Sequence, residues 1–239
     1  MIPADDAAVD RIVVIVSNDT SDLWFATRLQ ESANVVAVLV EDPVPVPDRS
    51  PLLVTVARNF ARPVALAGKV WELSYGRWHA RRSCYTDPSF QVGVGGNDQE
   101  LNERDGVGYR YLGFDASPND PDTIEWLENQ RPDVIATCGA SILSRRVLGV
   151  PSKAAVNLHG GLSQYYRGIR TTDWAVLNGE PQMVGATVHL ISPGVDDGGI
   201  ILQGRPEIEP DDHPNRLYEK VVRLGVDMVV AALAAIEQD

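Results

Sequence analysis

The stretch that decides the fold of this chain reads Val-Asn-Leu-His-Gly-Gly-Leu at residues 156–162. Tyr-Tyr-Arg-Gly follows at 165–168, and Pro-Gly-Val-Asp-Asp-Gly-Gly-Ile-Ile stands at 193–201. In an extended segment, side chains two positions apart point to the same face, so Asn157 and His159 share a face and Leu158 points into the core. The stretch therefore predicts a strand that delivers two polar side chains at its carboxyl end.

Apolar runs and helical spacings alternate on both sides of this stretch. The runs that predict strands are 11–16, 35–40, 107–113, 134–138, 154–158, 185–190 and an antiparallel-looking 200–203. Helices are predicted at 23–32, 123–129, 142–148, 171–177 and 215–237. This alternation favours a single α/β domain over residues 1–239 with a mostly parallel sheet. No G-x-G-x-x-G or Walker A loop follows the first strand, so the usual dinucleotide and P-loop fingerprints are absent.

Composition narrows the class of partner. The chain has 239 residues and a formal net charge of −12, so nucleic acid is not expected as a partner. No apolar run reaches the ~18 residues of a membrane span, and the first ten residues do not resemble a secretory signal.

Two cysteines, Cys84 and Cys138, do not indicate a disulfide framework, so we expect a cytoplasmic protein. The four histidines lack ligand spacing, so no metal site is expected. A homodimer is left open.

Residues 52–106 interrupt the alternation and are interpreted as an insertion. Four prolines precede it at 43–51, and its last part is polar and rich in glycine. Trp71, Tyr75 and Trp78 recur at roughly helical spacing. Such a stripe serves either as a binding face or, more simply, as the packing face of a helix.

The polar residues suit acyl-group chemistry on an amine. In open α/β sheets ligands bind beyond the carboxyl ends of the strands, where Asn157 and His159 are expected. Asp196 lies in a glycine-rich turn between two strands that can fold back to the same edge. An amide can stabilise an oxyanion, and an imidazole oriented by a carboxylate can move protons near neutral pH. Each residue also has an ordinary structural interpretation, as a turn former, a core histidine or a local cap.

The order of five motifs resembles the formyltransferase family, which uses N10-formyltetrahydrofolate. The match covers about 132–203 and consists of Asn157-x-His159, the turn at 166–168, Trp-Ala-Val-Leu-Asn-Gly at 174–179, Gly-Ala-Thr-Val-His at 185–189 and Gly-Val-Asp-x-Gly-x-Ile-Ile at 194–201. The family includes glycinamide ribonucleotide transformylase, methionyl-tRNA formyltransferase and nucleotide-sugar N-formyltransferases. The resemblance implies a Rossmann-like, twisted and mostly parallel sheet.

The resemblance also implies roles for particular residues. Asn157, His159 and Asp196 would be the catalytic triad. The pterin of the donor would lie between two loops, and the substrate side would involve the turn after the histidine and the insertion. These implied contacts are Cys138, Gly139, Ile142, Leu143, Gly194 and Val195 for the donor, and Tyr166, Arg167 and Trp78 for the acceptor.

Two differences from the family pattern indicate which kind of acceptor to expect. The purine member has a glycine-rich phosphate loop after its first strand, where this chain has Asp19, which disfavours a phosphate. The tRNA-acting member has a further basic domain, whereas this chain is acidic and ends at Asp239. We therefore expect formyl transfer to a small-molecule amine, such as a nucleotide-linked amino sugar or a natural-product intermediate. The alternatives are a formyltetrahydrofolate hydrolase that uses water as nucleophile, and a folate-binding module without activity.

Overall fold

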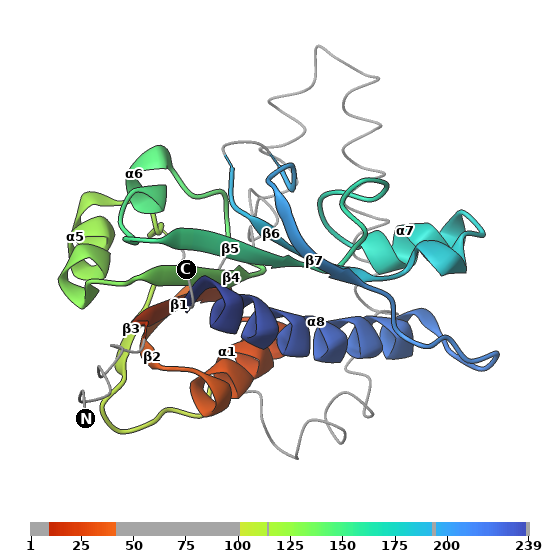
Figure 1. The fold of residues 1–239 in the computed structure, drawn as a ribbon, viewed down its shortest axis with the longest axis horizontal. Helices are drawn as coiled ribbons and strands as arrows, with labels where there is room; N and C mark the ends of the chain where they lie inside the picture. The colour runs from red at the N-terminus through yellow and green to blue at the C-terminus, as the bar shows by residue number, and fades with distance from the viewer. Residues whose placement is uncertain (1–9, 42–100, 114, 193–194, 238–239) are drawn as a thin grey trace, which may run out of the picture.

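The computed structural model describes residues 10–41, 101–113, 115–192 and 195–237 (Figure 1). The expectations for residues 52–100, including Trp78, and for Gly194 lie outside the described residues. The strands are β1 (Ile12–Ser17), β2 (Val35–Glu41), β3 (Gly108–Tyr111), β4 (Val134–Cys138), β5 (Ala154–His159), β6 (Ala186–Leu190) and β7 (Ile200–Gly204). They form one sheet in the order β3-β2-β1-β4-β5-β6-β7.

The sheet is mostly parallel, as the sequence predicts. The pairs from β3 to β5 are all parallel, and β6 pairs antiparallel with both β5 and β7. The resulting Rossmann-like α/β fold confirms the predicted fold class. Every residue of β1 is buried, because helices cover both faces of a parallel sheet and leave no polar side to its central strands.

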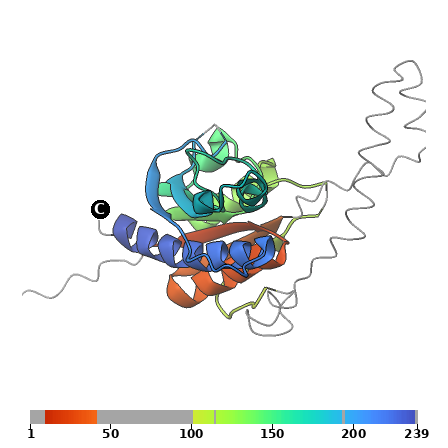
Figure 2. The same cartoon turned by 90° about the vertical axis from the view of Figure 1, so that its right-hand side faces the viewer.

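Two helical layers cover the sheet. On one face lie α1 (Thr20–Ser32) and the long α8 (Pro214–Glu237), which run side by side (Figure 2). On the other lie α5 (Pro121–Gln130) and α6 (Arg145–Leu148), and α7 (Thr171–Leu177) stands beyond the end of β5 (Figure 1). Successive side chains of each strand enter alternate layers. Val156 and Leu158 of β5 belong to the core under α1 and α8, whereas Ala155 packs on the α5–α6 side.

Four helix starts, those of α1, α5, α6 and α8, differ from the prediction by one to three residues. Two of the differences have a clear local cause. Helix α5 begins at Pro121, two residues early, because proline is favourable in the first turn of a helix, where no N–H partner is lost. Helix α6 begins at Arg145 and not at 142, because the Ser144 side chain caps it by accepting from the Val147 N–H. Residues 139–144 therefore form a loop, which is called the β4–α6 loop below.

Residues 101–106 pack against α1. Leu101 is buried, and the Asn102 N–H donates to the Thr27 hydroxyl at 3.4 Å. The Arg104 guanidinium donates to the Gln30 carbonyl at 2.5 Å. The end of the predicted insertion is thus part of the layer that covers the sheet. Among the helices of the described residues, none has the length and apolarity needed to cross a bilayer.

Candidate active site

Polar side chains gather where β4, β5 and β6 meet. Asn157 of β5 stands directly opposite His189 of β6 in the antiparallel register, and its Nδ2 lies 3.2 Å from Nε2 of that histidine. On its other side, the Thr137 hydroxyl of β4 donates to Asn157 Oδ1 at 2.7 Å. These two contacts fix which way the amide points. An amide nitrogen carries two hydrogens, so one can face His189 while the other is available to a ligand.

His159 is buried and engaged on both sides of its ring. Its Nε2 lies 2.7 Å from the Tyr166 carbonyl oxygen, and its Nδ1 lies 3.4 Å from Asp196 Oδ2. Both ring nitrogens thus face oxygens, the Tyr166 carbonyl on one side and the Asp196 carboxylate on the other. His159 thereby joins the end of β5 to two loops.

Asp196 connects two histidines that lie on different strands. Its Oδ2 also accepts from the Gly168 N–H at 2.8 Å, and its Oδ1 lies 3.6 Å from His189 Nε2. Burial by itself would raise the pKa of Asp196, but the bonds from His189 and Gly168 and the charge of His159 outweigh it and lower the pKa. Asp196 adopts φ 48, the left-handed region that asparagine and aspartate tolerate best among residues with a side chain. The carboxylate is thus held ionised at the centre of the cluster.

His189 is a fourth member that was not among the predicted site residues. Its Nδ1 lies 2.8 Å from the Leu190 carbonyl, so Nδ1 carries a proton. Burial would lower its pKa, but Asp196 and the Leu190 carbonyl outweigh burial and raise it. Its Nε2 cannot accept from Asn157 and donate to Asp196 at the same time, so its protonation state decides which of them it holds. The signal was present in the Gly-Ala-Thr-Val-His motif, where strand alternation places His189 on the face of Thr187, opposite to Val188 and the core under α1 and α8.

The predicted donor contacts of the β4–α6 region fall into different environments. Cys138 is buried, and its thiol donates to Asp22 Oδ1 at 3.4 Å, on the α1 side of the sheet. Burial raises the pKa of this thiol well above its usual range. Gly139 has φ 66 and is exposed. Ile142 is 72% exposed, whereas Leu143 is buried in the core below α5 and α6. Gly139 and Ile142 therefore reach the surface of the loop, and Cys138 and Leu143 anchor its ends.

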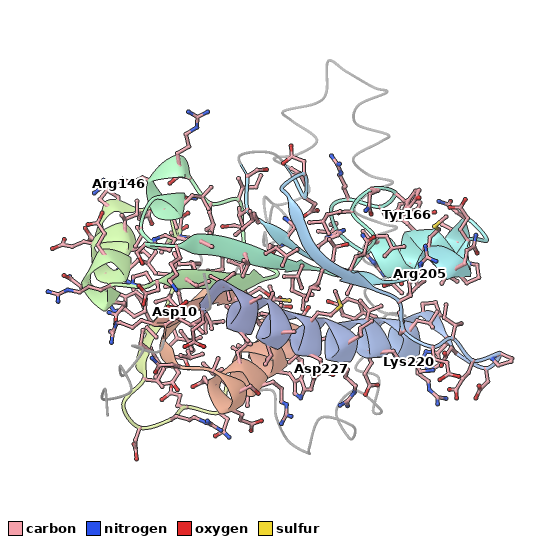
Figure 3. The ribbon with its side chains drawn as sticks, viewed as in Figure 1. Asp10, Arg146, Tyr166, Arg205, Lys220 and Asp227 are labelled. Carbon is pink, nitrogen blue, oxygen red and sulfur yellow. The ribbon has the colours of Figure 1, made fainter. Side chains whose placement is uncertain are left out.

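The predicted acceptor contacts lie beside α7, where Figure 3 places Tyr166. The Tyr166 hydroxyl donates to Glu180 and its carbonyl faces His159. The Arg167 Nε donates to the Ser163 carbonyl at 2.7 Å, and the residue as a whole is exposed. Val195, next to Asp196, is 54% exposed. The structure thus brings Tyr166 and Val195 to the rim of the cluster. Within the ranges that the structure describes, no three His, Cys, Asp or Glu side chains are grouped so as to hold a metal ion.

The fold and this cluster define an α/β protein with an amide–imidazole–carboxylate site at the carboxyl edge of its sheet. The sequence model of the formyl transferase family matches residues 101–233, just over half of the chain, and the chain belongs to that family. The match includes every described member of the cluster.

Individual relatives agree with this membership. The chain is 30% identical over 132 residues to the methionyl-tRNA formyltransferase of Caldanaerobacter subterraneus subsp. tengcongensis, over 55% of this chain and 42% of that protein. It is 35% identical over 118 residues to that of Chlorobium chlorochromatii, over 49% of this chain and 37% of the relative. The matched part thus spans less than half the length of these curated relatives.

Solved structures share the fold. The phosphoribosylglycinamide formyltransferase of Anaplasma phagocytophilum superposes with a TM-score of 0.61 at 17% identity, covering 97% of this chain and 88% of its own. A sugar N-formyltransferase from a Shewanella species superposes with a TM-score of 0.51 at 16% identity, covering 95% of this chain and 70% of its own. At these identities the likeness concerns the fold.

Proposed function

We propose that this protein transfers a formyl group from N10-formyltetrahydrofolate to an amine of a small-molecule acceptor. The observation that carries the proposal is the convergence of Asn157, His159 and Asp196, which are separated along the chain, around one edge of the sheet. Membership of the formyl transferase family supplies the reaction class.

Asn157 and Asp196 have different proposed roles in acyl transfer. When an amine adds to a formyl carbon, the carbonyl oxygen becomes negative and needs a donor that is already oriented. The Asn157 amide is only partly buried and is held on both sides, by Thr137 and His189, so it is the side chain best placed for that role. Asp196 holds the two imidazoles.

His159 is the candidate for moving the proton that the attacking amine loses. Its Nε2 carries a hydrogen that it donates to the Tyr166 carbonyl in this structure. The contact must therefore open, and that hydrogen must pass to the departing folate nitrogen, before Nε2 can take the proton of the amine. Hydrogen bonds at catalytic residues commonly rearrange when substrate binds. The turn at residues 166–168 reaches the site through the Tyr166 carbonyl and the Gly168 N–H, so the exchange involves two backbone groups of one turn.

The residues present fit the formyl donor. The exposed Ile142 offers an apolar contact for a flat ring. The β4–α6 loop follows the strand that pairs with Asn157, and the turn that carries Val195 and Asp196 reaches the same cluster through His189. These two loops are the segments that would hold the pterin, with Gly139, Ile142 and Val195 as its contacts among the described residues.

For the acceptor we propose a small amine, with a nucleotide-linked amino sugar as the first class to test. The described surface near α7 carries Tyr166 and Arg167 and the exposed Ile169 and Trp174. An aromatic and apolar rim, in which the second exposed guanidinium, that of Arg170, is paired with Asp173, suits a sugar ring or a base more than an extended polyanion. The negative net charge of −12 also disfavours tRNA.

The proposal is tested by incubating the purified chain with N10-formyltetrahydrofolate and a panel of amines, including amino-sugar nucleotides, and following formylated product by mass spectrometry. We expect formyl transfer to at least one amine. We expect Asn157→Ala, His159→Ala and Asp196→Ala each to lower turnover by about 10²-fold or more while the circular dichroism spectrum stays that of the parent.

Three outcomes would contradict the proposal. Near-normal transfer by all three variants would remove the triad assignment. Formate release at an equal rate with and without every amine would instead identify a hydrolase. Tight binding of tetrahydrofolate with no turnover for any amine would identify a binding module.

A further inference from the structure

Two side chains from other parts of the chain, Glu41 and Asn119, form hydrogen bonds with the β4–α6 loop. Glu41, the last residue of β2, accepts from the Ser141 N–H at 2.5 Å and from the Ser141 hydroxyl at 2.8 Å. Asn119, which precedes α5, donates to the Ile142 carbonyl at 2.9 Å and accepts from the Ser144 N–H at 2.6 Å. The loop backbone is therefore fixed at three of its six residues.

Glu41 is an unusual residue for this position. Its side chain is 3% exposed, and it follows Ala37 and Leu39 of the same strand face, which are part of the apolar core. Burying a carboxylate is unfavourable unless hydrogen bonds compensate. Both of its oxygens bond to one loop residue. A carboxylate placed in this way specifies where Ser141 lies, which an apolar side chain in the same space would not do.

The contacts of Glu41 and Asn119 with the loop determine which of its side chains are exposed to solvent. Leu143 is buried beside α5 and α6, while its neighbour Ile142 is 72% exposed. An isoleucine side chain is normally withdrawn from water. Here the backbone on both sides of Ile142 is held, by Glu41 through Ser141 and by Asn119 through Ser144, so the side chain stays presented at the surface.

The loop is also coupled to the catalytic cluster. Thr137, two residues before Gly139, donates to Asn157 Oδ1 at 2.7 Å. A displacement of the loop would shift the end of β4, and the shift would change the position of the Asn157 amide through Thr137. The register pairs Thr137 with Asn157 directly, so the two lie side by side on neighbouring strands.

We propose that Glu41 and Asn119 are positioning residues for the formyl donor, which hold the β4–α6 loop in the shape that receives its ring system. This inference rests on the proposed function, because it takes the donor to bind at this loop. The two residues act through Ser141, Ile142 and Ser144 and do not need to touch the donor or the acceptor.

The test compares the donor and acceptor sides in the full chain. Glu41→Gln, Asn119→Ala and the milder Ser141→Ala are assayed for KM of the donor, KM of the acceptor and kcat. Tetrahydrofolate affinity is measured separately by calorimetry. We expect Glu41→Gln and Asn119→Ala to raise the donor KM and the tetrahydrofolate Kd about tenfold. Glu41→Gln turns one of the two oxygens that accept from Ser141 into an NH2 donor, and Asn119→Ala removes both of its bonds to the loop. The acceptor KM should stay within roughly twofold.

A matched control is available at the opposite end of the sheet. Asp10 is a buried carboxylate that pairs with Lys153 at 2.9 Å, and Figure 3 shows it far from Tyr166. Asp10→Asn should lower the melting temperature without changing donor affinity. Ser141→Ala removes one hydroxyl from an exposed residue, so it folds even if Glu41→Gln does not, and we expect it to weaken donor binding in the same direction.

The outcomes separate this inference from the proposed function. If the parent protein transfers formyl groups but the Glu41, Asn119 and Ser141 variants bind tetrahydrofolate as tightly as it does, the positioning role is wrong and the function stands. An equal rise in donor and acceptor KM, or the same rise in Asp10→Asn, would also overturn it. If the parent neither binds tetrahydrofolate nor transfers a formyl group, the function itself fails.

Discussion

The amide of Asn157 and the imidazole of His189 face each other across β5 and β6, with Nδ2 and Nε2 3.2 Å apart. The contact joins the residue proposed to stabilise the oxyanion to a buried histidine that has its own carbonyl and carboxylate partners. Because Thr137 holds the other side of the amide, the orientation of Asn157 depends on both neighbours. We therefore expect His189 to position Asn157, which the next experiment tests.

A double-mutant cycle in turnover tests this coupling. Asn157→Ala should lower kcat by about 10²- to 10³-fold, and His189→Ala by about tenfold, because the amide loses one of its two supports. The double variant should be no slower than Asn157→Ala alone, since a residue that acts through another adds nothing once that other is gone. Losses that multiply would show that His189 contributes independently of Asn157.

The charge pair within the cluster makes stability depend on pH. The pKa of His189 is raised above its ordinary 6.5, so its contribution is complete below pH 6.5 and is lost as the pH rises through the folded-state pKa. The pKa of Asp196 is lowered below 3.8, so its contribution is present above that value and is lost as the pH falls further. Both contributions are present together between about pH 4.5 and 6.5.

Asp196→Asn should therefore reduce the free energy of unfolding most in that window, by about 1–3 kcal/mol, and less above the raised pKa of His189, where the imidazole is neutral. Urea unfolding at several pH values measures the difference. Asp197→Asn is the control, because Asp197 is exposed and its carboxylate bonds Ser192. A constant effect of Asp196→Asn across the whole range would contradict the coupling.

Gly139 is predicted to be intolerant of a side chain. A Cβ there would lie 1.8 Å from Asp22 Oδ2, and φ is +66. The variant Gly139→Ala should lose at least about 2 kcal/mol of stability, because the left-handed conformation costs about 1–2 kcal/mol and the crowding adds to it. Gly106→Ala is the matched control, since Gly106 has φ +82 with nothing within 4 Å. Equal losses in the two variants would show that only the backbone conformation matters.

Two adjacent glycines after Asp196 differ sharply in their surroundings. A Cβ on Gly198 would lie 1.7 Å from the Leu190 carbonyl oxygen, whereas on Gly199 the nearest atom is a Leu190 methyl at 3.9 Å. The Leu190 carbonyl is the partner of His189 Nδ1. Gly198→Ala should therefore lower turnover by about tenfold or more by displacing the cluster, and Gly199→Ala should remain close to the parent. Steady-state kinetics on the two variants decide the question, and equal activities would contradict it.

The sequence by itself determined the architecture and the neighbourhood of the site. The apolar runs that became β1, β2 and β4 predict strands buried on both faces, and strand alternation places Asn157 and His159 on the face opposite Leu158. These are local properties, because the side chains involved are neighbours along one strand and the backbone period alone relates them.

Only the tertiary structure decided which distant groups surround those residues. His189 meets Asn157 across 32 positions and Glu41 meets Ser141 across 100, and no local pattern states such a pairing. Sheet order and register bring the partners together, and the burial of a charge near a hydrogen-bond donor then sets its pKa. A sequence shows which residues reach the edge of the sheet, whereas the contacts that orient an amide or hold a loop arise when separate strands close against each other.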